Sequence, residues 1–167
     1  TSNQLKGETW NKSGGFQLSG KTVGIIGCGH IGKDLVKLLK PFGCQVLVND
    51  ILDLGAFCDL EGTQQVSLDK LYAQADFITI HTPFTPLTKN LLNAAAFEKM
   101  KRGAIIINTA RGGIVNQEDL KAALLSGQLG GAALDTYEEE PPEDTHLLKI
   151  PNLINTPHIG GNAREAE

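Results

Sequence analysis

The stretch that decides the fold is "TVGIIGCGHIG", residues 22–32. Its first part is short and rich in β-branched residues, which predicts a strand, and the residues after it predict a helix. Gly27, Gly29 and Gly32 form the pattern G-x-G-x-x-G at the junction. This pattern indicates dinucleotide binding only where it leaves a strand and opens a helix, and that context is met here. The alternative is a glycine-rich turn without a ligand.

Each glycine would have its own role in such a loop. Gly27 permits the tight turn, Gly29 lets the backbone approach a pyrophosphate, and Gly32 lets helix and strand pack closely. Free N–H groups at the start of the helix attract the phosphates. Asp50 ends the next predicted strand, near the position of the acid that binds a ribose diol. Because no Arg or Lys follows within residues 49–57, the sequence favours NAD over NADP.

Outward from this loop, apolar strands alternate with amphipathic helices. Strands are predicted at 22–27, 45–50, near 66, and at 76–81, 103–108, 131–135 and 152–156. Helices are predicted at 31–42, 67–75, 94–100 and 116–127. Ser67 and Asn116 are candidate N-caps, Pro41 and Gly127 are candidate stops, and the strand at 103–108 is apolar enough to be buried on both faces. This alternation predicts an α/β fold, a doubly wound parallel sheet of the Rossmann type.

Composition excludes several other classes of protein. The net charge of −4 provides no basic surface for nucleic acid, and no apolar run approaches the ~20 residues of a membrane span. The three cysteines have no metal-ligand spacing, so we expect reduced thiols in a cytoplasmic protein and no metal site. Residues 1–20 are predicted to form an N-terminal arm and residues 21–167 the dinucleotide-binding domain. The first and last residues suggest a fragment of a longer protein.

Two side chains at predicted strand ends could serve a hydride-transfer enzyme, which needs a cation for a substrate carboxylate and a proton donor for the developing alkoxide. Arg111 follows the strand at 103–108, and a guanidinium can bind a carboxylate through two parallel hydrogen bonds. His158 follows the last predicted strand, and an imidazole can exchange a proton with an alcohol near neutral pH. The alternatives are an arginine paired with an acid at the sheet edge and a structural histidine.

The remaining histidines and Cys28 are weaker candidates for a chemical role. His30 lies in the glycine loop, where its backbone matters more than its ring. His81 ends a strand and is expected to pack, and His146 lies in a polar stretch and is expected to be solvated. Cys28 is interpreted as a small filler of the turn, because no base accompanies it.

The acidic stretch "ALDTYEEEPPED", residues 133–144, has two candidate functional carboxylates. Asp135 ends a strand and so belongs near the cofactor. Glu140 precedes a proline, which holds it extended, and a carboxylate beside His158 would favour the protonated imidazole. Glu138 and Glu139 are interpreted as solvated.

Taken together, these blocks resemble the cofactor domain of the D-isomer-specific 2-hydroxyacid dehydrogenases from about Trp10 to the last residue. The further blocks that carry the resemblance are "ADFITIHTPFTPLTKNLLN", "KRGAIIINTARGGIVNQEDL", "GAALDTYEEEPPE" and "LINTPHIGG". The interval between Glu140 and His158 is short, and in this it is similar to the same interval in the branch of the family that acts on 3-phospho-D-glycerate. Cys28 and His30 stand where the family often has Leu and Arg, and the loss of the arginine would weaken pyrophosphate binding.

The resemblance implies a role for each candidate residue. Arg111 would bind the substrate carboxylate, and His158 would be the general acid/base with Glu140 as its charge partner. The expected cofactor-binding residues are Gly27, Gly29, His30, Ile31, Gly32, Asp50, Thr82, Thr109, Arg111, Asp135, His158 and Gly161.

The resemblance also implies what the chain lacks. The family has a second, substrate-binding domain, and here we expect an isolated cofactor domain that binds NAD, dimerises with a second copy, and has little turnover alone. The expected activity of the whole enzyme is oxidation of 3-phospho-D-glycerate, the first step towards serine. The alternatives are reduction of hydroxypyruvate or glyoxylate, an NAD(H)-sensing corepressor-like binding module, and a non-enzymatic dinucleotide-binding interaction domain.

Overall fold

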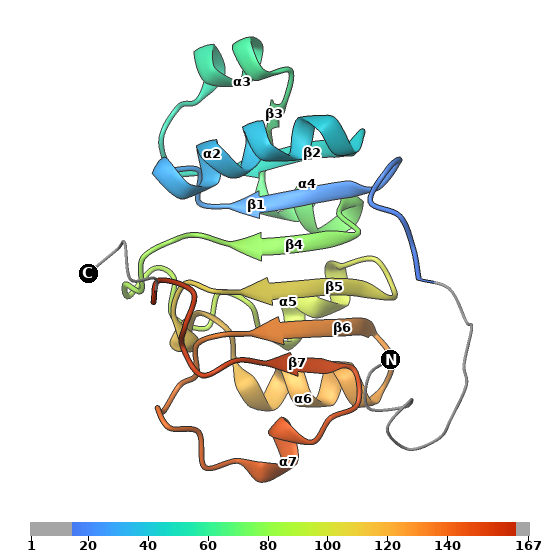
Figure 1. The fold of residues 1–167 in the computed structure, drawn as a ribbon, viewed down its shortest axis with the longest axis vertical. Helices are drawn as coiled ribbons and strands as arrows, with labels where there is room; N and C mark the ends of the chain where they lie inside the picture. The colour runs from blue at the N-terminus through green and yellow to red at the C-terminus, as the bar shows by residue number, and fades with distance from the viewer. Residues whose placement is uncertain (1–14, 163–167) are drawn as a thin grey trace.

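The computed structural model describes residues 15–162, whose centre is a seven-stranded parallel sheet of order β3-β2-β1-β4-β5-β6-β7 (Figure 1). The strands are β1 (Thr22–Ile26), β2 (Gln45–Asn49), β3 (Gln64–Gln65), β4 (Phe77–Ile80), β5 (Ala104–Asn108), β6 (Leu129–Leu134) and β7 (Leu153–Asn155). Successive strands are added outward in one direction from β1 to β3 and in the other from β4 to β7, so the strand order reverses between the parallel neighbours β1 and β4. Ligands of such sheets bind outside the carboxyl ends of the strands at this point.

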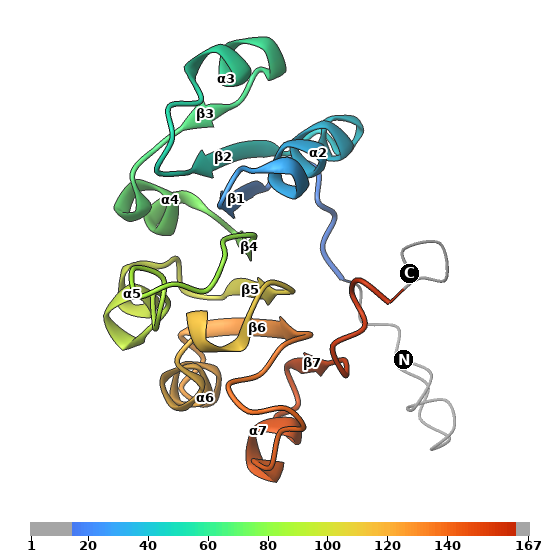
Figure 2. The ribbon, with the colours of Figure 1, turned by 90° about the vertical axis from the view of Figure 1, so that its left-hand side faces the viewer.

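Helices lie on both sides of the sheet. The helices are α2 (His30–Leu39), α3 (Gly55–Glu61), α4 (Leu68–Gln74), α5 (Ala94–Lys99), α6 (Gln117–Leu125) and α7 (Thr145–Leu148), with short 3₁₀ turns η1 (Lys40–Phe42) and η2 (Gly112–Ile114). Figure 2 shows α2 on one side of the sheet and α4, α5 and α6 on the other. The predicted α/β doubly wound sheet is confirmed.

Local signals placed two helix starts correctly, whereas the helix predicted at 31–42 ends at Leu39. The Ser67 side chain accepts a hydrogen bond from the Lys70 amide at 3.3 Å, and the Asn116 side chain accepts one from the Asp119 amide at 2.9 Å. Both are the predicted N-caps, which satisfy amides that the first helical turn leaves free. Pro41 lies in η1 directly after the end of α2, as expected of a residue that cannot continue a helix.

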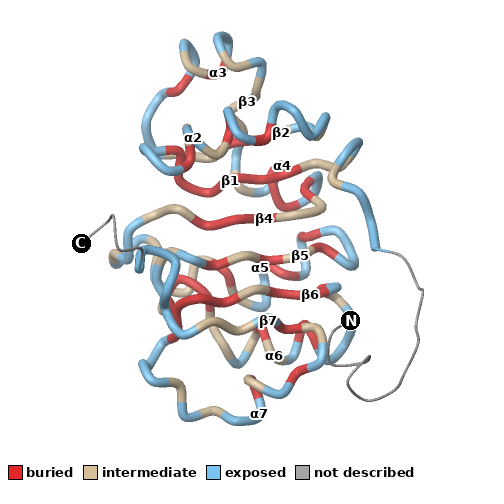
Figure 3. The backbone as a smooth tube through the Cα atoms, viewed as in Figure 1, coloured by how far each residue is buried: buried red, intermediate tan, exposed pale blue. Residues whose placement is uncertain are grey.

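The core has two parts because successive residues of a strand face opposite sides of the sheet. In β1, Val23 and Ile25 belong to the smaller cluster with Val36 of α2, and Ile26 belongs to the larger cluster with Phe97 of α5. Figure 3 shows the buried residues concentrated along the central strands. The strands therefore hold their carboxyl ends in fixed relative positions.

The prediction that the strand at 103–108 is buried on both faces is wrong. Burial alternates along β5: Ala104, Ile106 and Asn108 are buried, whereas Ile105 and Ile107 are only half-buried. The buried set faces α4, α5 and α6, and the other face of β5 has no helix over it among residues 15–162 (Figure 2).

Two helices were not predicted: α3, which begins without a side-chain cap, and α7, whose four residues are too few to show a hydrophobic period. The α7 helix depends on Asp144, whose carboxylate accepts hydrogen bonds from the amides of His146 at 2.9 Å and Leu147 at 3.1 Å. His146 is exposed, as predicted, but in the first turn of this helix instead of a loop. Residues 1–14 of the predicted N-terminal arm, and residues 163–167, lie outside the described residues. Between residues 15 and 162, no helix is long and apolar enough to cross a membrane.

Candidate active site

Two adjoining cavities open at the carboxyl ends of the strands. The first, of about 810 Å³, is lined by residues that follow β1, β4, β5, β6 and β7, among them Ile31, Thr82 and Asp135. The second, of about 760 Å³, is lined by Lys89, Glu140 and others. Phe84, Arg111 and His158 line both cavities. Of the predicted catalytic residues, Arg111 and His158 therefore lie at the boundary between the two cavities, and Glu140 lines the second.

The glycine loop has the geometry that a pyrophosphate requires. Gly27 has a φ of +89°, and a side chain there would meet the backbone of His81 at 2.7 Å. A Cβ on Gly32 would collide with the carbonyl oxygen of Gly27, whereas Gly29 faces open space. Gly29 is the N-cap of α2, where no side chain caps the helix, and His30 and Ile31 are its exposed first residues. Free amides beside open space are the arrangement that binds phosphate.

Asp50 lies directly beside this loop. Its carboxylate accepts hydrogen bonds from the Cys28 amide at 2.7 Å and from the Leu52 amide at 3.0 Å. A carboxylate has about four acceptor positions, so these two bonds leave capacity for a ribose diol. The structure thus places Asp50 as predicted, and it shows a contact that ties the acid to the loop.

The residues predicted at the nicotinamide end line the first cavity. These are Thr82, Thr109, Asp135 and Gly161. The hydroxyl oxygen of Thr82 is buried and has no hydrogen-bond partner among the described residues. An unsatisfied buried hydroxyl is unfavourable, and a ligand group in the cavity would satisfy it. Together with the glycine loop, this free hydroxyl fits a dinucleotide.

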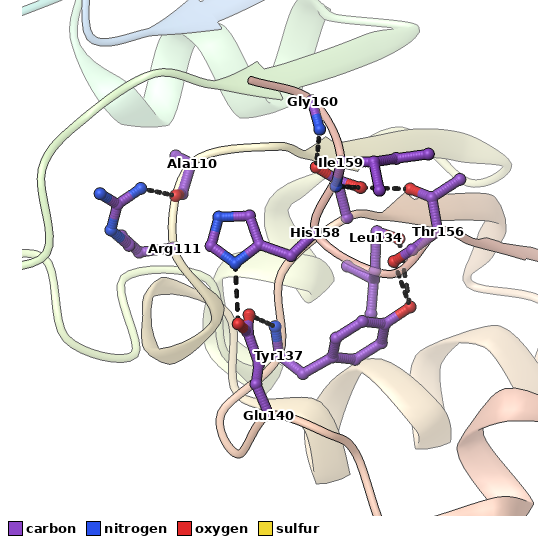
Figure 4. A network of polar contacts seen from close by, with 10 residues as sticks. Ala110, Arg111, Leu134, Tyr137, Glu140, Thr156, His158, Ile159 and Gly160 are labelled. Atoms are coloured by element: carbon purple, nitrogen blue, oxygen red, sulfur yellow. Dashed lines mark hydrogen bonds and ion pairs between the residues drawn. The ribbon is translucent and has the colours of Figure 1, made fainter. Parts of the chain in front are cut away.

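His158 and Glu140 form a direct pair. The Nδ1 atom of His158 lies 2.7 Å from Oε2 of Glu140, and Oε1 of Glu140 accepts a hydrogen bond from the Tyr137 amide at 3.1 Å (Figure 4). The hydrogen bond from His158, followed by that from Tyr137, lowers the pKa of Glu140. With an ionised Glu140 as acceptor, Nδ1 carries a hydrogen and Nε2 is left to exchange a proton with a ligand.

Arg111 lies beside this pair with its guanidinium exposed. Its Nη1 donates a hydrogen bond to the carbonyl of Ala110 at 2.7 Å, and among residues 15–162 it forms no salt bridge (Figure 4). The alternative of an arginine paired with an acid at the sheet edge is therefore not what the described residues show. A Cβ on the next residue, Gly112, would collide with the backbone of Tyr137 and Glu138, so only glycine permits this approach of the two loops.

Asp135 is the most heavily bonded carboxylate at the site, with 4% of the residue exposed. It accepts hydrogen bonds from the Thr156 hydroxyl at 2.5 Å, the Ile159 amide at 3.0 Å and the Gly160 amide at 2.7 Å. Burial by itself would raise the pKa of Asp135, but these three bonds and the nearby His158 together lower it. Sequence reasoning placed Asp135 near the cofactor but did not foresee this contact with the His158 loop.

One of the two glutamates interpreted as solvated has a structural role. The Glu138 carboxylate accepts a hydrogen bond from the Gln117 amide at 3.0 Å, at the start of α6. The prediction for Glu138 is thus wrong in part: the residue is exposed, but it caps a helix that lies 21 residues earlier in the chain. Glu139 is exposed, as predicted.

Two of the residues thought unsuited to chemistry, His81 and Cys28, are half-buried and buried respectively. His81 is half-buried, its Nε2 lies 3.0 Å from the Thr79 hydroxyl, and burial lowers its pKa. Cys28 is buried, and burial raises the pKa of its thiol to about 11, so it is not a thiolate at neutral pH. Sequence reasoning missed Tyr137 and Thr156, which form hydrogen bonds in the loops that carry Glu140 and His158. No local pattern marks either residue, because their contacts join separate strand ends.

Known proteins share this fold and this site region. Residues 1–160 match the family model of the D-isomer specific 2-hydroxyacid dehydrogenase, NAD binding domain. The chain is 40% identical over 165 residues to D-3-phosphoglycerate dehydrogenase of Rattus norvegicus, covering 98% of this chain and 31% of the relative. It is 41% identical to glycerate dehydrogenase of Methylorubrum extorquens, covering 98% of this chain and 53% of that one. The crystal structure of a glyoxylate reductase from Paecilomyes thermophila superposes with a TM-score of 0.90 at 32% identity, over 99% of this chain and 51% of that one.

The chain therefore spans between about a third and about half of the length of these relatives. The match over nearly all of this chain extends from the glycine loop to the His158 loop, the two ends of the site. On this evidence the chain belongs to the D-isomer-specific 2-hydroxyacid dehydrogenase family, as its NAD-binding domain.

Proposed function

We propose that this chain is the cofactor domain of an NAD-dependent dehydrogenase that oxidises 3-phospho-D-glycerate to 3-phosphohydroxypyruvate, the first step towards serine. The observation that carries the proposal is the His158–Glu140 pair, at 2.7 Å, beside the exposed guanidinium of Arg111. A 2-hydroxy acid needs a cation for its carboxylate and a base for its hydroxyl, and these side chains supply both.

Arg111 would bind the substrate carboxylate and the oxygen on C2. Its planar fork can donate two parallel hydrogen bonds, which fixes the orientation of the substrate as well as its charge. Because the guanidinium has no carboxylate partner among the described residues, it needs to break no ion pair before binding. The oxygen on C2 would then face His158.

His158 would take the hydroxyl proton through Nε2 during oxidation and return it during reduction. Its Nδ1 remains bonded to Glu140, whose negative charge stabilises the imidazolium that forms. The same pair therefore serves both directions of the reaction.

NAD would be held by Gly27, Gly29, Gly32 and the amides of His30 and Ile31 at the pyrophosphate, and by Asp50 at the adenosine ribose. Thr82, Thr109, Asp135 and Gly161 would line the nicotinamide end, next to Arg111 and His158. When bound, NAD supplies the nicotinamide ring that accepts the hydride from C2. The orphaned Thr82 hydroxyl and the open face of Gly29 support this placement.

The choice of substrate rests on the relatives and on one side chain. The rat relative is named a D-3-phosphoglycerate dehydrogenase, and Lys89 lines the cavity beyond Arg111, where a second cation suits a phosphate on C3. The second candidate is a reductase of hydroxypyruvate or glyoxylate. The glycerate dehydrogenase and glyoxylate reductase among the relatives favour it.

A substrate screen of the full-length enzyme tests the proposal. We expect kcat/KM to be highest for 3-phosphoglycerate with NAD, and lower for glycerate and lactate. A preference for hydroxypyruvate or glyoxylate with NADH would select the second candidate. Tight NADH binding without turnover of any of these acids would contradict both, and would point to a binding module.

The 167-residue chain should itself bind the cofactor, with NADH bound more tightly than NADPH. Asp50 presents a carboxylate where the 2′-phosphate of NADPH would lie. Asp50→Ala should therefore lower the ratio of the Kd for NADPH to the Kd for NADH by about tenfold, the effect of removing one charged partner. Calorimetry of the wild-type chain and of Asp50→Ala, each with NADH and with NADPH, measures the two Kd values. Asp59→Ala, which removes an exposed acid of α3, is the control. No binding of NADH at millimolar concentration would contradict the prediction.

The proposal extends to the whole protein. Residues 21–167 would be the cofactor domain of a two-domain enzyme, preceded by the arm at 1–20. The chain covers 31% of the length of the rat relative, and this supports the proposal. The family resemblance supports a homodimer formed through this domain. The free thiols of Cys28, Cys44 and Cys58 suit a cytoplasmic location. Light scattering of the full-length protein checks the dimer.

A further inference from the structure

The backbone at His158 needs support from outside the residue. His158 has a φ of +53°, a left-handed conformation that is uncommon for residues other than glycine. Its side chain is 45% exposed and that of Glu140 is 38% exposed, so burial does not hold the pair together. An exposed ion pair is too weak to impose an unfavourable backbone conformation. Something else must keep the imidazole in place.

The Asp135 carboxylate is bonded on both sides of His158. Its Oδ1 accepts the Thr156 hydroxyl, two residues before His158, and the Ile159 amide, directly after it. Its Oδ2 accepts the Gly160 amide. In Figure 4 the labelled donors of these bonds, Thr156, Ile159 and Gly160, lie on the side of His158 away from Glu140. One buried carboxylate is thus hydrogen-bonded on both sides of the left-handed residue. We call Asp135 and its bonds to Thr156, Ile159 and Gly160 the Asp135 bracket.

Thr156 is the fixed end of this bracket. Its amide donates to the carbonyl of Leu134 at 3.0 Å, and its own carbonyl accepts a hydrogen bond from the Tyr137 hydroxyl at 3.1 Å. Its hydroxyl donates to Asp135 at 2.5 Å, the length of a strong charge-assisted bond. Every polar group of Thr156 is therefore bonded to the end of β6 or the turn after it. The His158 loop cannot shift without breaking one of these bonds.

We propose that Asp135 and Thr156 are positioning residues that hold His158 in its left-handed conformation and so aim its imidazole at Glu140 and the substrate. This proposal rests on the proposed function, because it assigns the purpose of the bracket to proton transfer by His158. Asp135 would thereby have a role besides its expected place beside the nicotinamide. Thr156 does not line either cavity, so it can be altered without removing a cofactor contact.

The test replaces Thr156 by valine, which keeps the shape of the side chain and removes the hydroxyl donor. Thr136→Val is the matched control: Thr136 is buried, adjoins Asp135 in the chain, and its hydroxyl has no partner among the described residues. In the 167-residue chain, amide hydrogen exchange of Ile159 and Gly160 is measured by NMR. We expect exchange to accelerate by about tenfold in Thr156→Val, because a hydrogen-bonded network loosens together, and to stay unchanged in Thr136→Val. If the exchange of Ile159 and Gly160 stayed unchanged in both variants, the proposal that Thr156 and Asp135 hold the His158 loop would be overturned.

The second arm measures kinetics in the full-length enzyme. A misdirected catalytic group lowers turnover strongly, so we expect kcat of Thr156→Val to fall by about tenfold, with the KM for substrate and the Kd for NADH little changed. A merely structural role would lower the melting temperature and leave kcat at the level of Thr136→Val, and this result would overturn the positioning role. If His158→Ala retained full turnover, the proposed function would fail, while the exchange measurement would still decide whether the bracket exists.

Discussion

Replacing His158 by alanine in the full-length enzyme is expected to lower kcat by about 10²–10⁴-fold, the range that a positioned general acid/base contributes. At about a thousandfold, this corresponds to roughly 4 kcal/mol of lost transition-state stabilisation. The Kd for NADH should change by no more than about twofold, since the imidazole acts mainly in the transition state. Steady-state kinetics and a fluorescence titration with NADH measure kcat and Kd separately.

The left-handed backbone of His158 requires a second variant. Alanine disfavours a φ of +53°, whereas asparagine tolerates it, so His158→Asn separates loss of the imidazole from a change in backbone. We expect both variants to lose turnover to the same extent. His146→Ala, which removes an exposed histidine on α7, is the control and should keep wild-type kcat. Equal losses of turnover and NADH affinity in His158→Ala would argue against the acid/base role.

Replacing Arg111 by lysine is the second change with a large expected effect. Lysine keeps the positive charge but cannot make two parallel hydrogen bonds to a carboxylate. We expect kcat/KM for the 2-hydroxy acid to fall by about a hundredfold, or nearly 3 kcal/mol, with both kcat and KM affected. Arg111→Ala should lose more, because the charge is lost as well.

Steady-state kinetics with the preferred substrate checks this prediction, and NADH binding provides the internal reference. Arg111 donates only to the Ala110 carbonyl among the described residues, so the substitution should not unfold the domain. Arg102→Lys, at an exposed position between α5 and β5, is the matched control and should be neutral. If Arg111→Lys kept wild-type kcat/KM, the guanidinium fork would not be what recognises the carboxylate.

Features that depend on neighbouring residues were predictable from the sequence. The glycine loop between β1 and α2 and the caps Ser67 and Asn116 follow from rules that act within a few residues. The meeting of Arg111, Glu140 and His158 follows from one further rule, that the carboxyl ends of parallel strands share one edge of the sheet. The partial exposure of Ile107 did not follow, because it depends on which helices cover each face of the sheet.

The sequence by itself determined the doubly wound fold and the dinucleotide loop, and it indicated the candidate side chains Arg111, Glu140 and His158, because each is encoded by residue type, spacing and strand order. Only the tertiary structure decided what the acidic stretch around Asp135 does. Glu138 accepts a hydrogen bond from the first residue of α6, and Asp135 accepts hydrogen bonds from both sides of His158. The partners in these bonds are 21 or more residues apart in the chain. A carboxylate takes whichever donors the folded backbone brings to it, and these donors come from strand ends that only the assembled sheet places side by side.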